Sequence, residues 1–200
     1  MAEVDIYWRA VNALKDEKLI IMPTETVYGI VGLATSKKAV EKIYAIKGRA
    51  KEKALPIMVS DINYLEGYAQ LSDSFIKLAK AFWPGPLTIV TKKGPKLSGE
   101  VTGGQETVAV RIPDHRIALK ILKSIKKPLA ATSANLSGEP PATKVSDIEE
   151  EIKKQVALVI DEGESEIKQA STVIDITSSK PKVLREGPIS VDDIMVLLQI

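Results

Sequence analysis

The sequence predicts an α/β fold in which helices flank one twisted, open, mixed sheet. Two observations predict it. Some segments carry apolar residues at helical spacing, others are short apolar or β-branched runs, and the two kinds interleave along the whole chain. No stretch resembles a linker between domains. We therefore expect a single domain over residues 1–200.

The helices are predicted by spacing and by their end signals. Ser72 is a candidate N-cap, and Trp83-Pro84-Gly85-Pro86 must end the helix after it, because two prolines and a glycine cannot continue a helix. Ser190-Val-Asp-Asp resembles a capping box that opens a last helix. The expected helices are Glu3–Glu17, Lys38–Ile46, Ser72–Phe82, Ile117–Ile125, an acidic helix at Val145–Lys154, and Ser190–Leu198.

The strands are predicted by short runs that are apolar throughout or alternate with polar residues. Pro23 stops the first of these runs. The segment Lys93–Gln105 is rich in Gly, Pro and Ser, and we expect it to be a mobile loop. The expected strands are Leu19–Met22, Pro56–Val59, Leu87–Thr91, Thr107–Ile112, Leu129–Thr132, Val156–Asp161, Thr172–Thr177 and Val183–Leu184.

The composition excludes several classes of chemistry. The chain has no cysteine, which excludes disulfides, thiolate nucleophiles and cysteine zinc sites. It has one histidine, His115, so a Ser-His-Asp triad would have to include it, and multi-histidine metal sites are excluded. We expect His115 to be structural. The P-loop pattern G-x-x-x-x-G-K-[ST] is absent.

Positive charge is concentrated in one segment. The net charge is only +2, yet residues 37–53 hold seven basic residues against two acidic ones. This excess indicates either an anionic partner, such as phosphates or nucleic acid, or a solvated surface. No apolar run reaches the roughly 18 residues of a membrane span, and acids stand where a signal peptide carries bases. We expect a cytoplasmic protein without membrane contact.

Four polar segments at the ends of predicted elements are candidates for a site, since such loops carry function in α/β folds. They are Pro23–Gly29, Lys47–Arg49, Thr132–Gly138 and Ala170–Asp175. Each has an ordinary alternative, namely a polar turn. For Arg185, which follows the fourth segment, the alternative is a surface salt bridge.

Seven motifs together resemble one family. PTETVYG, KGR, WPGPLT, VAVRIPDH, TSANLSG, STVID and LREG occur in the order of the YrdC-like, or TsaC-like, family, from about Met22 to Gly187. Its members are threonylcarbamoyl-AMP synthases, which combine L-threonine, bicarbonate and ATP and release pyrophosphate. A separate transferase then passes the threonylcarbamoyl group to an adenosine of tRNA. The resemblance implies this activity, the one-domain form of the family, and a sheet with a basic concave face.

The resemblance also implies site residues. Lys47 and Arg49 are implied to be catalytic, with Mg²⁺ carried by ATP and no metal held by the protein. The residues implied to bind ATP are Lys47, Arg49, Lys53, Thr107, Ser133, Asn135, Thr143 and Arg185. The residues implied to bind threonine are Thr26, Arg111, Thr132 and Ser171. Of these, Arg111 suits the threonine carboxylate, because a guanidinium makes planar two-point contacts.

The chain departs from the family pattern in the segment after Arg49. Ala50 stands where many members have proline, Lys53-Ala54-Leu55 where many have Asn-Pro-Leu, and Met58 where some have histidine.

Two other functions stay open. One is a non-catalytic module that binds double-stranded RNA on the same basic face, although only 4% of the residues are aromatic and base stacking would be scarce. The other is acyl or carbamoyl transfer to a different amine. If the chain has the synthase activity that the resemblance implies, we expect any tRNA binding to be weak, sensitive to salt and suppressed by ATP.

Overall fold

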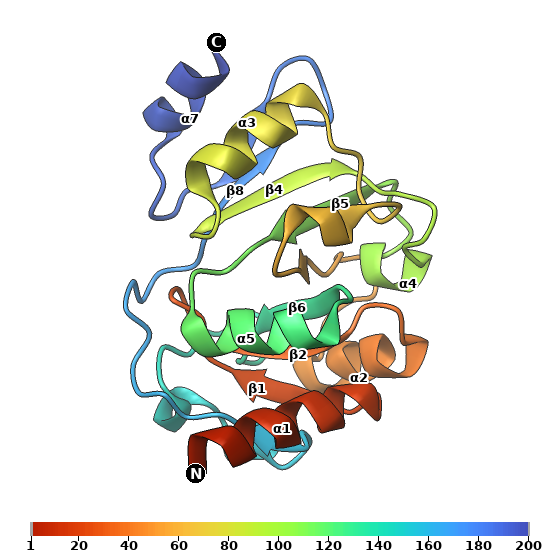
Figure 1. Ribbon diagram of the computed structural model, residues 1–200, viewed down its shortest axis with the longest axis vertical. Helices are drawn as coiled ribbons and strands as arrows, with labels where there is room; N and C mark the ends of the chain where they lie inside the picture. Colours follow the sequence, from red (N-terminus) through yellow and green to blue (C-terminus); the bar gives the residue numbers. More distant parts are fainter. Residues whose placement is uncertain (1, 200) are drawn as a thin grey trace.

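The computed structural model describes residues 2–199, with side chains from Asp5 onward. Its strands form one nine-stranded mixed sheet in the order β7-β1-β2-β6-β3-β5-β4-β8-β9 (Figure 1). The strands are β1 Ile20–Met22, β2 Gly29–Leu33, β3 Ile57–Met58, β4 Leu87–Lys92, β5 Thr107–Arg111, β6 Leu129–Ser133, β7 Leu158–Val159, β8 Thr172–Asp175 and β9 Lys182–Arg185. The sheet is open and helices flank it, as the sequence predicts.

Parallel and antiparallel pairs are mixed throughout the sheet. The pairs β1–β7, β3–β5 and β4–β8 are parallel. The pairs β1–β2, β2–β6, β3–β6, β4–β5 and β8–β9 are antiparallel. Neighbours in the sheet are therefore often distant in the sequence, and β3 lies between β6 and β5.

The helices are α1 Ala2–Lys15, α2 Lys37–Lys47, α3 Asp73–Phe82, α4 Gly99–Thr102, α5 Arg116–Ile125, α6 Glu150–Lys153 and α7 Val191–Leu198. Two short 3₁₀ turns, Ile62–Leu65 and Val145–Asp147, connect other elements. The predicted N-caps are confirmed, because the Ser72 hydroxyl accepts a hydrogen bond from Phe75 N and the Ser190 hydroxyl accepts one from Asp193 N. These bonds satisfy backbone donors that the first helical turn leaves free.

Apolar residues cover both faces of the strands. Along β1, Ile20 and Met22 pack into one core cluster with α1 and α5, whereas Ile21 packs into a second cluster with residues of α2 and α3. This division follows from the strand period of two, which points successive side chains to opposite faces. Helices α1 and α5 lie side by side over one face (Figure 1). The continuous apolar runs in the sequence thus reflect burial on both sides.

Three expectations about local structure are wrong. Strand β2 was not predicted, because its two glycines have low strand propensity; Gly32 packs closely there, since a Cβ would lie 2.5 Å from Leu19 Cδ2 and 3.1 Å from Ala39 Cβ. Part of the expected loop 93–105 is helix α4, which buries Val101. The expected acidic helix 145–154 breaks into a 3₁₀ turn and α6, because Ile148 adopts an extended conformation.

Candidate active site

A cavity of about 690 Å³ lies on one face of the middle of the sheet. Strands β4, β5 and β8 contribute alternate residues to it, namely Thr88, Val90, Thr107, Ala109, Arg111, Val173 and Asp175. The residues between them, such as Ile89, Val110 and Ile174, are buried in the core on the other face. Because successive side chains of a strand point to opposite faces, every second residue of these strands contributes to the floor of the cavity.

The segment after β1 forms one wall of this cavity through a chain of hydroxyl groups. Thr26 Oγ1 accepts a hydrogen bond from Arg111 Nη1 at 2.8 Å and lies 2.9 Å from Thr24 Oγ1. Thr24 Oγ1 in turn donates to the carbonyl of Val27 at 2.6 Å. Thr24 and Thr26 are buried, so the hydroxyl positions are fixed by these bonds.

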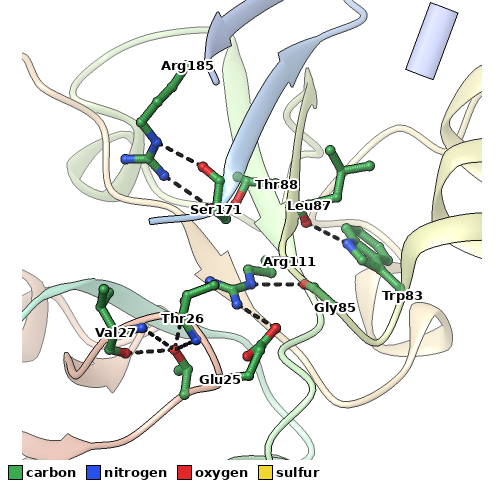
Figure 2. A network of polar contacts seen from close by, with 11 residues as sticks. Glu25, Thr26, Val27, Trp83, Gly85, Leu87, Thr88, Arg111, Ser171 and Arg185 are labelled. Carbon is green, nitrogen blue, oxygen red and sulfur yellow. Dashed lines mark hydrogen bonds and ion pairs between the residues drawn. The ribbon is translucent and has the colours of Figure 1, made fainter. Parts of the chain in front are cut away.

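Arg111 is held from three directions (Figure 2). Its Nη2 forms an ion pair with Glu25 Oε1 at 2.7 Å, its Nε donates to the carbonyl of Gly85 at 3.1 Å, and its Nη1 donates to Thr26. Burial lowers the pKa of Arg111, and the Glu25 carboxylate opposes this effect. A guanidinium has five N–H groups, so two make none of these contacts: one on Nη1, and one on Nη2, which is fully buried.

The WPGPLT motif positions Arg111 through its backbone. Gly85 supplies the acceptor carbonyl, and its own N–H donates to the carbonyl of Ile112 at 2.9 Å. A Cβ on Gly85 would lie 2.4 Å from the carbonyl oxygen of Phe82, so only glycine fits there. Trp83 Nε1 donates to the carbonyl of Leu87 at 2.7 Å and secures the turn (Figure 2).

Arg185 lies at the opposite side of the cavity from the Thr24–Thr26 wall and contacts Ser171 (Figure 2). Its Nε donates to the carbonyl of Ser171 at 2.9 Å, and its Nη2 donates to the Ser171 hydroxyl at 3.1 Å. That hydroxyl lies 2.7 Å from Thr88 Oγ1. Desolvation lowers the pKa of Arg185, and the positive charge of Arg111 lowers it further. Arg185 therefore belongs to the cavity and does not form the surface salt bridge that the sequence left open.

Lys47 lies directly behind the loop after β6. Its Nζ donates to the carbonyl of Ser133 at 2.8 Å and to Asn135 Oδ1 at 3.0 Å, and the residue is only 3% exposed. Burial lowers the pKa of Lys47 to about 8, and the positive charge of Arg49 contributes to this shift. Ser133 and Asn135 line the cavity, whereas Lys47 supports them from below.

Arg49 also lines the cavity. Its Nε donates to the carbonyl of Lys53 at 3.1 Å, and its Nη2 donates to the carbonyl of Ala54 at 3.0 Å. Desolvation lowers the pKa of Arg49. Among the residues whose side chains are described, Lys47, Arg49 and Arg185 form no ion pair with a carboxylate. Partly desolvated cations that lack an acidic partner favour an anionic ligand.

The structure brings most of the expected site residues to this one cavity. Nine of them line it, namely Thr26, Arg49, Thr107, Arg111, Thr132, Ser133, Asn135, Ser171 and Arg185. The other three do not line it: Lys47 lies behind the loop after β6, and two residues lie elsewhere. Lys53 has an exposed side chain and contributes only its carbonyl to Arg49. The Thr143 hydroxyl donates to Asp147 Oδ2 at 3.1 Å and does not line the cavity.

Sequence reasoning did not assign a role to Glu25, Thr88, Gln105 or Asp175. The last three line the cavity, and Glu25 orients Arg111. Thr88 and Asp175 occupy alternate positions of predicted strands, so the strand period could have indicated them. Over residues 5–199, no group of three or more His, Asp or Glu side chains is arranged to hold a metal ion. No helix in the described part is long and apolar enough to cross a membrane.

Known proteins resemble this chain over most of its length. The family model Sua5_yciO_yrdC, described as telomere recombination, matches residues 12–187. The threonylcarbamoyl-AMP synthase of Pyrococcus abyssi is 40% identical over 186 residues, which cover 92% of this chain and 55% of that protein. The threonylcarbamoyl-AMP synthase of Vibrio vulnificus is 35% identical over 182 residues, which cover 90% of this chain and 97% of that protein. The chain thus spans about half of the first relative and nearly all of the second.

Solved structures show the same fold. The crystal structure of P. abyssi Sua5 complexed with L-threonine has a TM-score of 0.93 and 39% identity, and the match covers 98% of this chain and 58% of that chain. The crystal structure of Escherichia coli YciO has a TM-score of 0.84 and 25% identity, with 95% and 93% covered.

Proposed function

The chain belongs to the Sua5/YciO/YrdC family, and on this premise we propose that it is a threonylcarbamoyl-AMP synthase. We propose further that residues 1–200 act as one domain in the cytoplasm. The observation that carries the proposal is the positive charge at and behind the cavity: Lys47, Arg49 and Arg185 have neutral hydrogen-bond partners only, and Arg111 keeps one N–H of Nη1 for a ligand. A polyphosphate and a carboxylate fit these two features.

The threonine carboxylate is expected at the remaining N–H of Arg111 Nη1, beside Thr26. Met58 pairs with Arg111 across β3 and β5 and lines the same cavity, so its apolar side chain is positioned to contact the threonine methyl group. Ser171 and Thr26 offer hydroxyl groups on either side. Threonine and ATP would thus bind to adjacent parts of one cavity.

The triphosphate is expected between Arg49 and the Ser133–Asn135 loop, with Arg185 on the nucleotide side. Arg49 would contact the phosphates as a catalytic residue, and the charge of Lys47 acts on them through the loop that it supports. Thr107 and Thr132 complete the lining. Lys53 and Thr143 would have to move to reach ATP. We expect Mg²⁺ to arrive bound to ATP, where it neutralises part of the triphosphate charge.

The chemistry follows from positioning. The threonine amine attacks the carbon of carbon dioxide and loses a proton, or attacks bicarbonate with loss of one water molecule, and forms a carbamate in either case. A carbamate oxygen then attacks the α-phosphorus, the bond to the β-phosphate oxygen breaks, and pyrophosphate leaves. Fixed cations stabilise the charge that develops on the phosphates, and a cavity that excludes water protects the labile carbamate. A separate transferase would use the adenylate to modify tRNA.

The test is incubation with ATP, bicarbonate and each amino acid in turn, without RNA. We expect pyrophosphate and the adenylate only when both threonine and bicarbonate are present. Serine should be the best substitute, about 10- to 200-fold less efficient, because it lacks one methyl group. Arg49→Ala should lose ATP affinity, while Arg9→Ala, at an exposed pair with Asp5, should not. Pyrophosphate release at full rate without threonine would contradict the proposal, and ATP-insensitive tRNA binding without adenylate formation would favour an RNA-binding module.

A further inference from the structure

One carboxylate lies on the floor of the substrate cavity. Asp175 lines the cavity from β8 and is half-buried. The other acidic residue of the lining, Glu139, is exposed and lies on the loop after β6. A carboxylate repels phosphate, so Asp175 must face another part of the ligand if this cavity binds ATP. Its surroundings indicate which part of ATP that is.

The fold uses only one oxygen of this carboxylate. Asp175 Oδ1 accepts hydrogen bonds from Thr177 N at 2.8 Å and from Thr177 Oγ1 at 2.6 Å. Within residues 5–199, Asp175 forms no ion pair and its Oδ2 has no hydrogen-bond partner. Oδ2 is not one of the fully buried polar atoms that lack a partner, so it keeps accessible surface. Thr177 thus fixes the side chain and leaves one acceptor oxygen for a ligand.

The register of the sheet gives Asp175 apolar neighbours. Asp175 pairs with Val90 on β4, and Val90 pairs with Ala109 on β5. Paired residues share a face of the sheet, and all three line the cavity. They form an apolar strip that ends in one acceptor. Two residues before Asp175, roughly 7 Å along the strand, Val173 pairs with Arg185, which is expected on the nucleotide side of the cavity.

Of the parts of ATP, the ribose fits this strip best. The phosphates are excluded by charge. The adenine amino group lies between two acceptor nitrogens of the ring, N1 and N7, and a carboxylate repels their lone pairs. The ribose is uncharged, has carbon atoms that can lie on an apolar strip, and carries two hydroxyl donors. Acidic side chains accept hydrogen bonds from ribose hydroxyls in other nucleotide-binding folds.

We propose that Asp175 accepts a hydrogen bond from a ribose hydroxyl through Oδ2 and makes the cavity selective for ribonucleotides over deoxyribonucleotides. This inference rests on the proposed function, because it takes ATP as the ligand. The same carboxylate sets the direction of the nucleotide. It holds the sugar at β8 and repels the phosphates, which then lie toward Arg49 and the Ser133–Asn135 loop.

A magnesium ion is the other partner that a single carboxylate beside a triphosphate could attract. Magnesium keeps several waters, which need polar surroundings, whereas Val90 and Val173 flank Asp175 on the cavity face. Among residues 5–199, no three acidic or histidine side chains are grouped to hold a metal ion. The apolar strip therefore favours the sugar, and omitting magnesium separates the two partners experimentally.

The first experiment measures nucleotide binding to the full chain by calorimetry in EDTA. ATP, 2′-deoxy-ATP, 3′-deoxy-ATP and ITP, which lacks the amino group of the base, are compared. We expect at least one deoxynucleotide to bind at least tenfold more weakly than ATP, and ITP to bind within about threefold of it. Equal affinity for ATP and both deoxynucleotides would overturn the proposal. So would a loss confined to ITP, which would assign Asp175 to the base, or a preference that appears only with magnesium.

A matched pair of variants assigns the preference to Asp175. Asp175→Ala should bring ATP and the deoxynucleotides within about twofold of each other. Asp61→Ala should keep the native ratio, because Asp61 Oδ1 accepts from Asn63 N at 2.8 Å in an exposed turn outside the cavity. Asp175→Asn, whose amide oxygen can replace Oδ1 in the turn, serves if the alanine variant does not fold, and should reduce the ratio. A native ratio in the folded variants of Asp175 would overturn the proposal, since a purely structural residue changes stability and not this ratio.

The second experiment follows adenylate formation from the same nucleotides with threonine, bicarbonate and magnesium, without RNA. We expect a KM at least tenfold higher for the deoxynucleotide that binds weakly. If both deoxynucleotides react with the KM of ATP, the role of Asp175 fails and the proposed function stands. If ATP binds with a preference that depends on Asp175 but no adenylate forms, the proposed function fails and the role of Asp175 stands. If none of the nucleotides binds, both are overturned.

Discussion

Lys47 should make both stability and triphosphate affinity depend on pH above about 8. Its ammonium group is nearly fully buried, and its partners are the neutral oxygens of Ser133 and Asn135. Burial and Arg49 lower its pKa from 10.5 to about 8, which corresponds to a penalty of about 3 kcal/mol for the charged form, at 1.36 kcal/mol per unit. The variant Lys47→Met removes this titration.

The sign of the stability effect follows from proton binding. Between pH 8 and 10.5 the unfolded chain keeps the lysine proton and the folded protein releases it. Because the unfolded state then binds more protons, stability rises with pH across this window. Below pH 8 both states are protonated and the full penalty is present. The free energy of unfolding of the native chain should therefore rise by up to about 3 kcal/mol relative to Lys47→Met.

The assay is urea unfolding at pH 7 to 10.5, with the native chain compared with Lys47→Met. Lys37→Met is the control, because Lys37 begins the same helix but is exposed and pairs with Glu100 at 3.3 Å. The control should follow the native curve. Parallel curves for the native chain and Lys47→Met would refute the assigned burial effect.

The titration of Lys47 should also make the affinity for triphosphate depend on pH. A bound polyanion near Lys47 should restore its pKa, so binding at pH 8 to 9 should take up a proton, and affinity should fall up to about tenfold per pH unit above pH 8. Calorimetry in buffers with different ionisation heats measures the uptake. A constant affinity with no proton uptake in the native chain would show that no phosphate binds near Lys47.

Three further predictions concern the Arg111 network and Tyr28, which lines the same cavity. Glu25→Gln should destabilise the fold by about 3–5 kcal/mol in urea unfolding, because it leaves the buried Arg111 charge without its partner; a loss below 1 kcal/mol would contradict this. Arg111→Lys should raise the KM for threonine at least tenfold in the pyrophosphate assay, because lysine lacks the planar fork that contacts Glu25, Gly85 and Thr26 and still has an N–H for the ligand; an unchanged KM would remove Arg111 from the threonine site. Tyr28→Phe should lower the free energy of unfolding by about 1 kcal/mol, because the Tyr28 hydroxyl donates to the carbonyl of Gly163 at 2.6 Å. Equal stability of the two proteins in thermal unfolding would show that this hydrogen bond does not stabilise the fold.

Local signals explain which elements the sequence predicted correctly. The caps at Ser72 and Ser190 and the turn after Phe82 depend on residues within one helical turn, and the structure confirms them. Strand β2 depends instead on distant partners, because its two glycines are accommodated between β1 and β6 under α2. Nothing within Gly29–Leu33 itself indicates these contacts. The strand order, in which β3 separates β6 from β5, is likewise set by packing across the chain.

The site was predictable to the extent that its residues lie in short motifs at strand ends. The loops at Thr26, Arg49, Ser133 and Ser171 meet at one cavity. The role of Glu25 was not predictable in this way. Its partner Arg111 lies on a strand far along the chain. The hydrogen bond between Arg111 and Thr26 likewise joins residues that are 85 positions apart. Only the fold shows that the carboxylate of PTET serves to orient an arginine.

The cations at the cavity differ in whether they pair with a carboxylate, and the two expected ligands, a polyphosphate and a threonine carboxylate, explain this difference. Carboxylates beside Lys47, Arg49 and Arg185 would raise the pKa values that burial lowers, but they would also compete with phosphates for the same charges. Neutral carbonyl, amide and hydroxyl partners hold these side chains in place and leave their charge for a polyanion. Arg111 is nearly fully buried and does pair with a carboxylate, yet that pairing involves the buried Nη2 and leaves one N–H of Nη1 for a monoanion. Replacing a neutral partner of the first three cations with an acid should therefore stabilise the fold and weaken ATP binding together, a coupling that an RNA-free synthase assay and urea unfolding measure side by side.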